Sequence, residues 1–326
     1  MIYYRCKSDK AAFYFAAEEY IMQEIRPDEP VCLLWQTDDT VMVGANQVVA
    51  LEIDKDYVMS LGINIVRRSS GGGAIFTDPG TLLYTIILPY GDVDPKEIAN
   101  KYFCAPVIRV LAELGVTATP EGRNDILIDG KKISGIAQYV KYGYICTHGS
   151  LLFNADLSKL LKVLTVDPEK ITSKALRSAG SRVVNIANYT DTKDISSLIN
   201  ALIEQCQAET KEFSESELAA IYDIKCEKYE AYDWTYGHNP PYTFHNSRRF
   251  EGGKIDVFMN IKNGKVADCR ITGDFLALRP VSEIETLIIG KQYDQESLRY
   301  AFSGISTSEY IGSVPKEEFI DMFAEK

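Results

Sequence analysis

A stretch rich in arginine and glycine, IVRRSSGGGAIFTDPGTLLYTII at residues 65–87, holds the first side chains that could do chemistry. The three consecutive glycines Gly71, Gly72 and Gly73 would let another group approach the backbone amides, and Arg68 could neutralise an anion held there. Neither common nucleotide motif fits, because no GxxxxGK[ST] sequence occurs and the residues after the glycines are typical of a strand rather than a helix. A glycine bulge in a sheet is the alternative that these residues leave open.

A second candidate lies in EGRNDILIDGKKISGIAQY, residues 121–139. Asn124 and Asp125 stand at the entry to a strand, and Lys132 follows on the returning strand of a predicted hairpin. Because paired strands lie side by side, a lysine and a carboxylate can face one site. The pattern fits solvated surface charges equally well.

A third candidate is His148 in THGSLLFNADLSKLL, one of three histidines in the chain. It precedes an apolar run that predicts a strand at 150–154, a setting in which a histidine is more often structural than catalytic. Lys174, Arg177 and Arg182 add positive charge downstream. The net charge of −11 argues against broad nucleic-acid binding, so an anionic ligand requires local clusters of this kind.

The composition predicts a globular protein with one large domain and a smaller companion. Of the 326 residues, 46% are hydrophobic and 25% are charged. No apolar run is long enough to span a membrane, and the first residues lack the pattern of a signal peptide. The seven cysteines include no CxxC pair, which indicates reduced thiols and a cytoplasmic location.

The elements that must position these residues follow from periodicity and turn signals. Helices are predicted at 11–26, 95–114 with a kink at Pro106, 156–164, 168–178, 193–208, 281–290 and 315–325. Strands are predicted at 31–35, 40–44, 63–68, 82–88, 125–129, 132–139, 254–260 and 265–272. Residues 233–250 are rich in aromatics, proline and asparagine, which is typical of a linker.

Five short motifs occur in the order and spacing of a known family. They are RR at 67–68, GGGAIF at 71–76, GRND at 122–125, KISG at 132–135 and HGSLL at 148–152. On these motifs the chain resembles the lipoate–protein ligase A family over nearly its whole length. The resemblance implies an α/β (α+β) fold with a large mixed-sheet catalytic domain of the biotin/lipoate ligase type at 1–245. A linker at about 233–250 and a small α+β accessory domain at 246–326 would follow.

The reaction implied by the resemblance has two steps. The carboxylate of (R)-lipoate attacks the α-phosphate of ATP in the presence of Mg²⁺. Pyrophosphate is released, and lipoyl-adenylate is formed. The lipoyl group then passes to a lysine of an acceptor, either a lipoyl domain of a 2-oxoacid dehydrogenase E2 subunit or the glycine cleavage H protein. The family also suggests a monomer, while the net charge and the lack of long apolar runs predict no nucleic-acid and no membrane partner.

The resemblance assigns roles to named residues. Lys132 matches the catalytic lysine that contacts the lipoyl carbonyl and α-phosphate oxygens, and Asp125 is expected to help hold Mg²⁺. The expected adenylate and lipoyl contacts are Arg68, Gly71, Gly72, Gly73, Ala74, Ile75, Phe76, Asn124, Asp125, Lys132 and His148. Candidates for the apolar tunnel, chosen by pattern, are Val41, Leu83, Tyr84 and Ile136.

Departures from the family pattern at Ala45, Thr77 and Thr81 surround the predicted ligand loop and could change the choice of acyl chain or acceptor. Two alternatives stay open. One is an octanoyl or lipoyl transferase of the same fold that acts without ATP, although residues 115–131 lack the cysteine nucleophile of such enzymes. The other is a degenerate lipoate-binding paralogue.

Candidates for an acceptor surface are Lys141, Lys174 and Arg177, and the predicted hinge lies at Pro240-Pro241.

Overall fold

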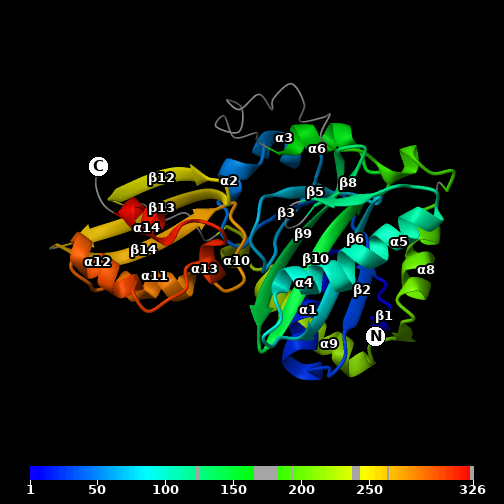
Figure 1. Cartoon of the computed structure of the whole chain (residues 1–326), viewed down its shortest axis with the longest axis horizontal. Helices are drawn as coiled ribbons and strands as arrows, with labels where there is room; N and C mark the ends of the chain where they lie inside the picture. The colour runs from blue at the N-terminus through cyan, green and yellow to red at the C-terminus, as the bar shows by residue number, and fades with distance from the viewer. Residues whose placement is uncertain (122–124, 165–182, 193, 237–242, 263, 324–326) are drawn as a thin grey trace.

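The computed structural model describes residues 1–121, 125–164, 183–192, 194–236, 243–262 and 264–323. Figure 1 shows a large part that carries the N-terminus and a smaller part that carries the C-terminus, side by side. The predicted helix at 168–178, Asn124, Lys174, Arg177 and Pro240-Pro241 lie outside the described residues. No helix among the described residues is long and apolar enough to cross a membrane.

An eight-stranded mixed sheet forms the centre of the large part. In spatial order its strands are β11 (Glu209–Lys211), β1 (Ile2–Tyr4), β2 (Val31–Trp35), β6 (Thr81–Pro89), β10 (Tyr144–Leu152), β9 (Lys131–Lys141), β8 (Asp125–Ile128) and β7 (Thr119–Glu121). The β11–β1 and β1–β2 pairs are parallel, and the remaining pairs are antiparallel. The predicted hairpin at 125–139 is confirmed, whereas β10 begins earlier than predicted and holds His148 in its interior.

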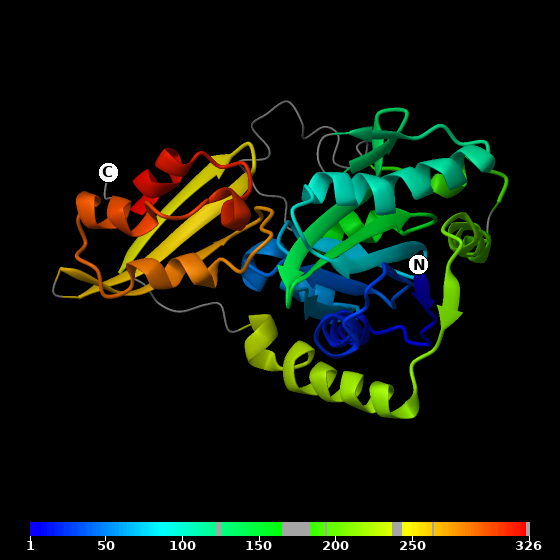
Figure 2. The same ribbon diagram turned by 60° about the horizontal axis from the view of Figure 1, so that its bottom comes forward.

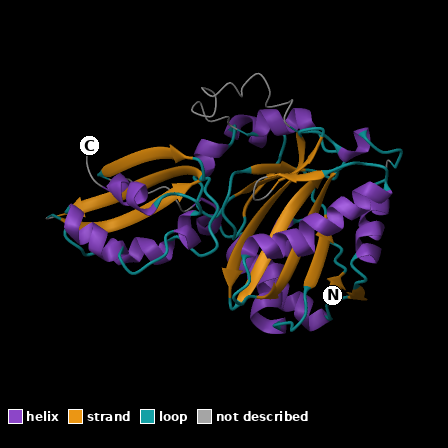
Figure 3. Ribbon diagram, viewed as in Figure 1, coloured by secondary structure: helices purple, strands orange, loops and turns teal. Residues whose placement is uncertain are grey.

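Helices cover both faces of this sheet (Figures 2 and 3). Alternate residues of β6 explain why, since Leu82 and Tyr84 pack in one core cluster while Leu83 and Ile87 pack in the other. One face holds α4 (Pro95–Ala99), η2 (Asn100–Cys104), α5 (Ala105–Glu113) and α8 (Ile195–Gln205). The other face holds α1 (Ala11–Tyr20), η1 (Ile21–Ile25), α9 (Glu215–Ile224) and η5 (Lys225–Tyr229).

A second, three-stranded sheet carries the glycine loop. Its strands are β4 (Asn64–Arg67), β3 (Thr40–Val43) and β5 (Ile75–Thr77), in that spatial order. The loop 68–74 thus connects the two strands that flank β3. The core of this sheet is closed by α2 (Val49–Glu52), α3 (Lys55–Ser60) and α6 (Leu157–Val163).

The predicted kink near Pro106 is a π-helical turn at 100–104 within an otherwise continuous helix. Pro106 has no N–H group, so it cannot donate to the carbonyl of Tyr102 four residues earlier. The buried hydroxyl of Tyr84 donates to that carbonyl at 3.2 Å instead. A side chain of the central sheet therefore satisfies the acceptor that proline leaves open.

The smaller part is an antiparallel sheet with helices on one side (Figure 1). Its elements are β12 (Phe244–Phe250), β13 (Gly253–Lys262), β14 (Lys265–Gly273), α11 (Ser282–Ile288), α12 (Gln295–Phe302), α13 (Ser308–Ile311), α14 (Lys316–Ile320) and η6 (Asp321–Phe323). The predicted linker at 233–250 is wrong over much of its length, because it includes most of α10 (Tyr232–Tyr236) and the whole of β12. All seven cysteines are free, as predicted.

The contact between Tyr84 and Tyr102 gives a test of this packing. Replacing Tyr84 with Phe removes the hydroxyl that donates to the carbonyl of Tyr102, which should destabilise the protein by about 1–2 kcal/mol. The lower midpoint of urea unfolding would report the loss. Tyr300→Phe is the matched control, since Tyr300 is 78% exposed and its change should stay within about 0.5 kcal/mol. Equal midpoints for both variants would contradict the assignment.

Candidate active site

A cavity of about 240 Å³ lies between the glycine loop and the strands β6, β9 and β10. Its lining residues are Phe15, Trp35, Met42, Arg68, Gly72, Gly73, Ala74, Ile75, Leu83, Lys132, Gly135, Ile136, Ala137, His148, Gly149, Ser150 and Leu276. Most of these side chains are apolar, and the cationic groups are those of Arg68 and Lys132. The cavity can therefore hold a ligand with a long apolar part and an anionic head.

The cavity brings together most of the residues predicted for the adenylate and lipoyl site. Arg68, Lys132 and His148 line it, as do the loop residues 72–75. Gly71, Phe76 and Asp125 are not among the lining residues, although Asp125 contacts Lys132.

Two of the four residues predicted for the apolar tunnel line this cavity. Leu83 and Ile136 line the cavity, whereas Tyr84 lies on the opposite face of β6 and Val41 belongs to the core of the small sheet. Successive strand residues point to opposite faces, so an apolar run does not reveal which of its members faces a cavity. Phe15, Trp35 and Met42 were missed.

The hairpin places the carboxylate of Asp125 and the ammonium of Lys132 together, as its spacing predicts. The Nζ atom lies 2.7 Å from Oδ1, and both side chains are partly exposed. A Cβ at Gly135 would lie 3.0 Å from this Nζ, so glycine leaves room for the lysine to turn over the strand. The small glycine at the end of the KISG motif at 132–135 thus makes space for the lysine at its start.

Two buried arginines hold the glycine loop. Arg68 donates from Nη1 to the carbonyl of Met42 at 3.0 Å and from Nη2 to those of Gly71 and Gly73 at 2.8 and 2.7 Å. Burial, followed by the charge of Arg67, lowers the pKa of Arg68 to about 10, so the guanidinium stays charged at neutral pH. Arg68 therefore shapes the loop as well as lining the cavity.

Arg67 was not predicted as a site residue, and its role is structural. Its guanidinium donates to the carbonyls of Gly44 and Gln47, both at 2.7 Å, and of Trp234 and Thr235, at 2.9 and 2.6 Å. These partners come from two distant segments, which the arginine joins behind the loop. The sequence, in which Arg67 and Arg68 are simply two adjacent basic residues, did not reveal that Arg67 is completely buried.

The smaller part of the protein explains two of the three glycines. A Cβ at Gly71 would lie only 2.7 Å from the carbonyl oxygen of Phe275 and 3.0 Å from the amide nitrogen of Ala277. Gly72 has φ of +90° and donates its N–H to Phe275 at 2.9 Å. The group that approaches these two glycines is thus another segment of the chain. Gly73 differs, since its nearest neighbour would be 4.0 Å away.

The segment 275–278 closes one side of the cavity. Leu276 lines it, and the carbonyl of Leu278 accepts the N–H of Val140 at 2.7 Å. Val140 lies near the end of β9, beyond the residues that pair with β8. The segment therefore covers an edge that the large sheet leaves open.

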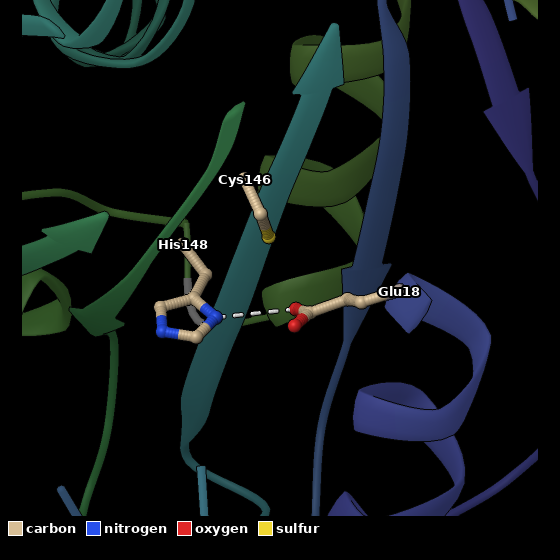
Figure 4. A group of neighbouring side chains, drawn as sticks. All are labelled: Glu18, Cys146 and His148. Carbon is tan, nitrogen blue, oxygen red and sulfur yellow. Dashed lines mark hydrogen bonds and ion pairs between the residues drawn. The ribbon is translucent and has the colours of Figure 1, made fainter. Parts of the chain in front are cut away.

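His148 lies in a buried polar cluster with Glu18 and Cys146 (Figure 4). Its Nε2 atom is 2.5 Å from the hydroxyl of Ser70, and Nδ1 is 3.2 Å from Glu18. Burial raises the pKa of the Cys146 thiol well above its usual range, so this thiol is unsuited to act as the nucleophile of a transferase.

The neighbouring Glu19 is buried as well. It pairs with Lys141 and with Lys228, and it accepts the hydroxyl of Tyr229 at 2.8 Å. Burial alone would raise the pKa of Glu19, but the two ammonium groups outweigh burial and lower it to about 2. Lys141 is therefore already paired, which weakens its prediction as part of an acceptor surface.

The three departures from the family pattern do not line the 240 Å³ cavity. Thr77 is buried with its hydroxyl 2.8 Å from that of Thr37, and the hydroxyl of Thr81 donates to Asp78 at 3.1 Å. Ala45 lines a separate cavity of about 280 Å³. Thr77 and Thr81 thus serve the fold around the loop.

The different surroundings of the glycines give a test. Gly71→Ala should push the segment 275–278 away, because its Cβ would clash with backbone atoms that cannot rotate aside. Hydrogen–deuterium exchange at the amides of Gly72 and Val140 should then become faster. Gly73→Ala, whose Cβ meets no close atom, should leave both amides as slow as in the native protein. Equal exchange in the two variants would refute this account of Gly71.

Comparisons with known proteins agree with this geometry. The family model of the lipoyl protein ligase A/B catalytic domain matches residues 10–207, and that of the bacterial lipoate protein ligase C-terminus matches residues 239–323. The lipoate-protein ligase LplJ of Bacillus subtilis is 36% identical over 94% of this chain and 95% of its own.

Solved structures show the same fold. LipL1 of P. falciparum in complex with lipoate has a TM-score of 0.81 at 20% identity and covers 98% of this chain and 97% of its own. The ligase of a bipartite system from Thermoplasma acidophilum, described with its E2 lipoyl domain, has a TM-score of 0.65 at 27% identity, covering 74% and 98%. A lipoate-protein ligase A bound with ATP gives 0.64 at 25% identity, covering 72% and 98%. On the matches of both domains and of the whole-length relative, the chain belongs to the lipoate-protein ligase A family.

Proposed function

We propose that this protein is an ATP-dependent lipoate–protein ligase. The carboxylate of lipoate attacks the α-phosphorus of ATP, pyrophosphate leaves, and lipoyl-AMP forms. The ε-amine of an acceptor lysine then attacks the acyl carbon, and AMP leaves. The observation that carries the proposal is the apolar cavity with Arg68 and the Lys132–Asp125 pair beside it, in a chain that matches the family at full length.

Lys132 supplies positive charge where two anions must meet. Its ammonium faces the cavity from β9 and can contact the acyl oxygen and an α-phosphate oxygen in turn. Fixed positive charge lowers the repulsion between the carboxylate and the phosphate in adenylation, and it stabilises the oxyanion that forms during acyl transfer. Lys132 acts through its charge in both steps and forms no covalent bond.

The apolar walls hold the acyl chain and keep water from the mixed anhydride. Trp35, Leu83 and Ile136 are buried and form part of these walls, and Leu276 adds a wall from the smaller part. We place the boundary between a catalytic domain and an accessory domain near residue 245. Movement of the accessory segment 275–278 would open the cavity to the acceptor.

Asp125 is the residue that we propose for Mg²⁺. Magnesium usually binds one or two carboxylates together with substrate phosphates, and Asp125 offers a partly exposed carboxylate next to the cavity lysine. The ion would neutralise phosphate charge. Asn124 belongs to the same proposal from the family motif alone.

The proposed acceptor is a lipoyl domain of an E2 subunit or the H protein of glycine cleavage. Support comes from the archaeal relative at 27% identity, which is described together with its E2 lipoyl domain. We also expect the protein to act as a monomer in the cytoplasm.

Exchange of labelled pyrophosphate into ATP isolates the first step from any choice of acceptor. The native protein should show exchange that requires lipoate and Mg²⁺. Lys132→Ala should lower it about 100- to 1000-fold, the usual effect of removing one charge-stabilising donor. Lys131→Ala is the control, because Lys131 is the exposed neighbour on the same strand and should keep near-native exchange. Absence of exchange in folded native protein would exclude the ATP-dependent reaction and favour acyl transfer from a carrier.

The magnesium assignment has its own test. Asp125→Asn keeps the shape of the side chain and removes its charge, so the Mg²⁺ concentration that gives half-maximal exchange should rise about tenfold or more. Asp129→Asn is the control, since Asp129 is exposed with φ of 50°, a conformation that asparagine tolerates. An unchanged Mg²⁺ requirement in Asp125→Asn would remove Asp125 from the metal site.

A further inference from the structure

A continuous chain of buried hydrogen bonds connects helix α1 with the glycine loop through His148. Arg68 Nε lies 3.1 Å from Ser70 Oγ, which lies 2.5 Å from His148 Nε2, and His148 Nδ1 lies 3.2 Å from Glu18 Oε1. Glu18 and Ser70 have no exposed surface, and His148 is 7% exposed. Figure 4 shows the bond between His148 and Glu18 at the end of the chain.

One arrangement of protons gives every donor of the hydrogen-bonded chain an acceptor. Arg68 can only donate, so Ser70 Oγ accepts from its Nε, and His148 Nε2 is the remaining partner that the described residues offer for the proton of Ser70. At the other end, the carboxylate of Glu18 accepts from Thr85 at 2.8 Å and Tyr139 at 3.3 Å, and it accepts the Nδ1 proton of the histidine. In this arrangement of protons His148 accepts on Nε2 and donates from Nδ1.

Glu18 also orients a second wall of the cavity. The Thr85 hydroxyl that donates to Glu18 accepts the indole N–H of Trp35 at 3.2 Å. Trp35 and His148 both line the cavity, whereas Glu18 itself does not. One buried carboxylate thus fixes two lining side chains and, through Ser70 and Arg68, the loop that faces them.

A metal site is the alternative role for this cluster, because ligand atoms of Glu18, Cys146 and His148 lie within 4.8 Å of one another. Glu18 already accepts three hydrogen bonds, and both ring nitrogens of His148 have partners. A metal would have to break this chain and take the proton of a thiol whose pKa burial raises strongly. The hydrogen-bonded chain is the better account of these residues.

We propose that Glu18 is a positioning residue for adenylation, which holds the glycine loop in place through His148 and Ser70. This inference rests on the proposed ligase function. Glu18 contacts no substrate in this account. Its effect is to fix the histidine tautomer that accepts from Ser70. This bond orients the Ser70 hydroxyl that receives Arg68, and the same guanidinium binds the loop carbonyls. Small displacements of such a loop are costly, because reacting groups must be held within fractions of an ångström.

Glu18→Leu and Glu18→Gln separate this role from simple filling of space. Leucine removes the acceptor and should lower kcat for lipoate-dependent pyrophosphate exchange about 10- to 100-fold. The KM for lipoate should change by a smaller factor than kcat, because Leu83 and Leu276 still line the cavity. Glutamine keeps an oxygen for Thr85 and His148, so exchange should stay within about fivefold of native. Ser70→Ala breaks the chain from its other end and should reproduce the effect of leucine.

The tautomer of His148 gives a readout that does not depend on activity. The chain has only three histidines, so ¹⁵N spectra of histidine-labelled protein resolve this ring directly. The native protein and Glu18→Gln should show the proton on Nδ1, and Glu18→Leu should lose this preference. Glu19→Gln, a change at the adjacent buried glutamate with different partners, should leave the signal of His148 as it is.

The outcomes are distinct. The inference would be overturned if the native protein shows exchange and the folded variants Glu18→Leu and Ser70→Ala keep its full rate. A proton on Nε2 of His148 in the native protein would overturn it as well. Cys146→Ala should keep its activity, and bound metal that disappears together with activity in this variant would replace the hydrogen-bonded chain by a metal site. Failure of exchange in the native protein would instead reject the ligase function, whatever tautomer His148 shows.

Discussion

A loop that contains three consecutive glycines must be held in one conformation by its neighbours, because glycine loses more conformational freedom on folding than any other residue. The four residues before the glycines provide this constraint. Arg67 and Arg68 bind backbone carbonyls with their buried guanidinium groups. Ser69 is connected through Tyr229 to Glu19, and Ser70 is connected through His148 to Glu18. The cavity and the contact between the two parts of the protein both depend on this anchored loop.

The buried charges are stable because each has several partners. A desolvated guanidinium or carboxylate is costly unless hydrogen bonds replace its water shell. The arginines use carbonyls of the loop and of distant segments, so satisfying their charge also sets the backbone path. Two adjacent glutamates of helix α1 face different networks, one based on a histidine and one based on two lysines. The contacts that stabilise the buried charges are thus the same contacts that fix the conformation of the loop.

The glycine loop also connects the smaller part of the protein to the cavity. Gly71 and Gly72 pack against the segment that includes Phe275 and Leu276, while Gly73 remains open toward the cavity. A displacement of this segment would therefore change the wall of the cavity and free the amide of Gly72 at the same moment. These direct contacts are sufficient to couple the two parts of the protein.

The sequence alone determined what depends on local pattern and short spacing. Many of the strands and helices, the hairpin that joins Asp125 to Lys132 and the family motifs could be read from neighbouring residues, since periodicity and turn chemistry act over a few positions. The helix α9, the strand β12 and the first half of β10 were missed. Tertiary structure decided the rest. The contacts of His148 with Ser70 and Glu18, and of Arg67 with Trp234, join residues that are 78, 130 and 167 positions apart. No local pattern reveals which buried glutamate will meet which donor. Even the reason for Gly71 is a contact with residue 275, which only the folded chain brings to that glycine.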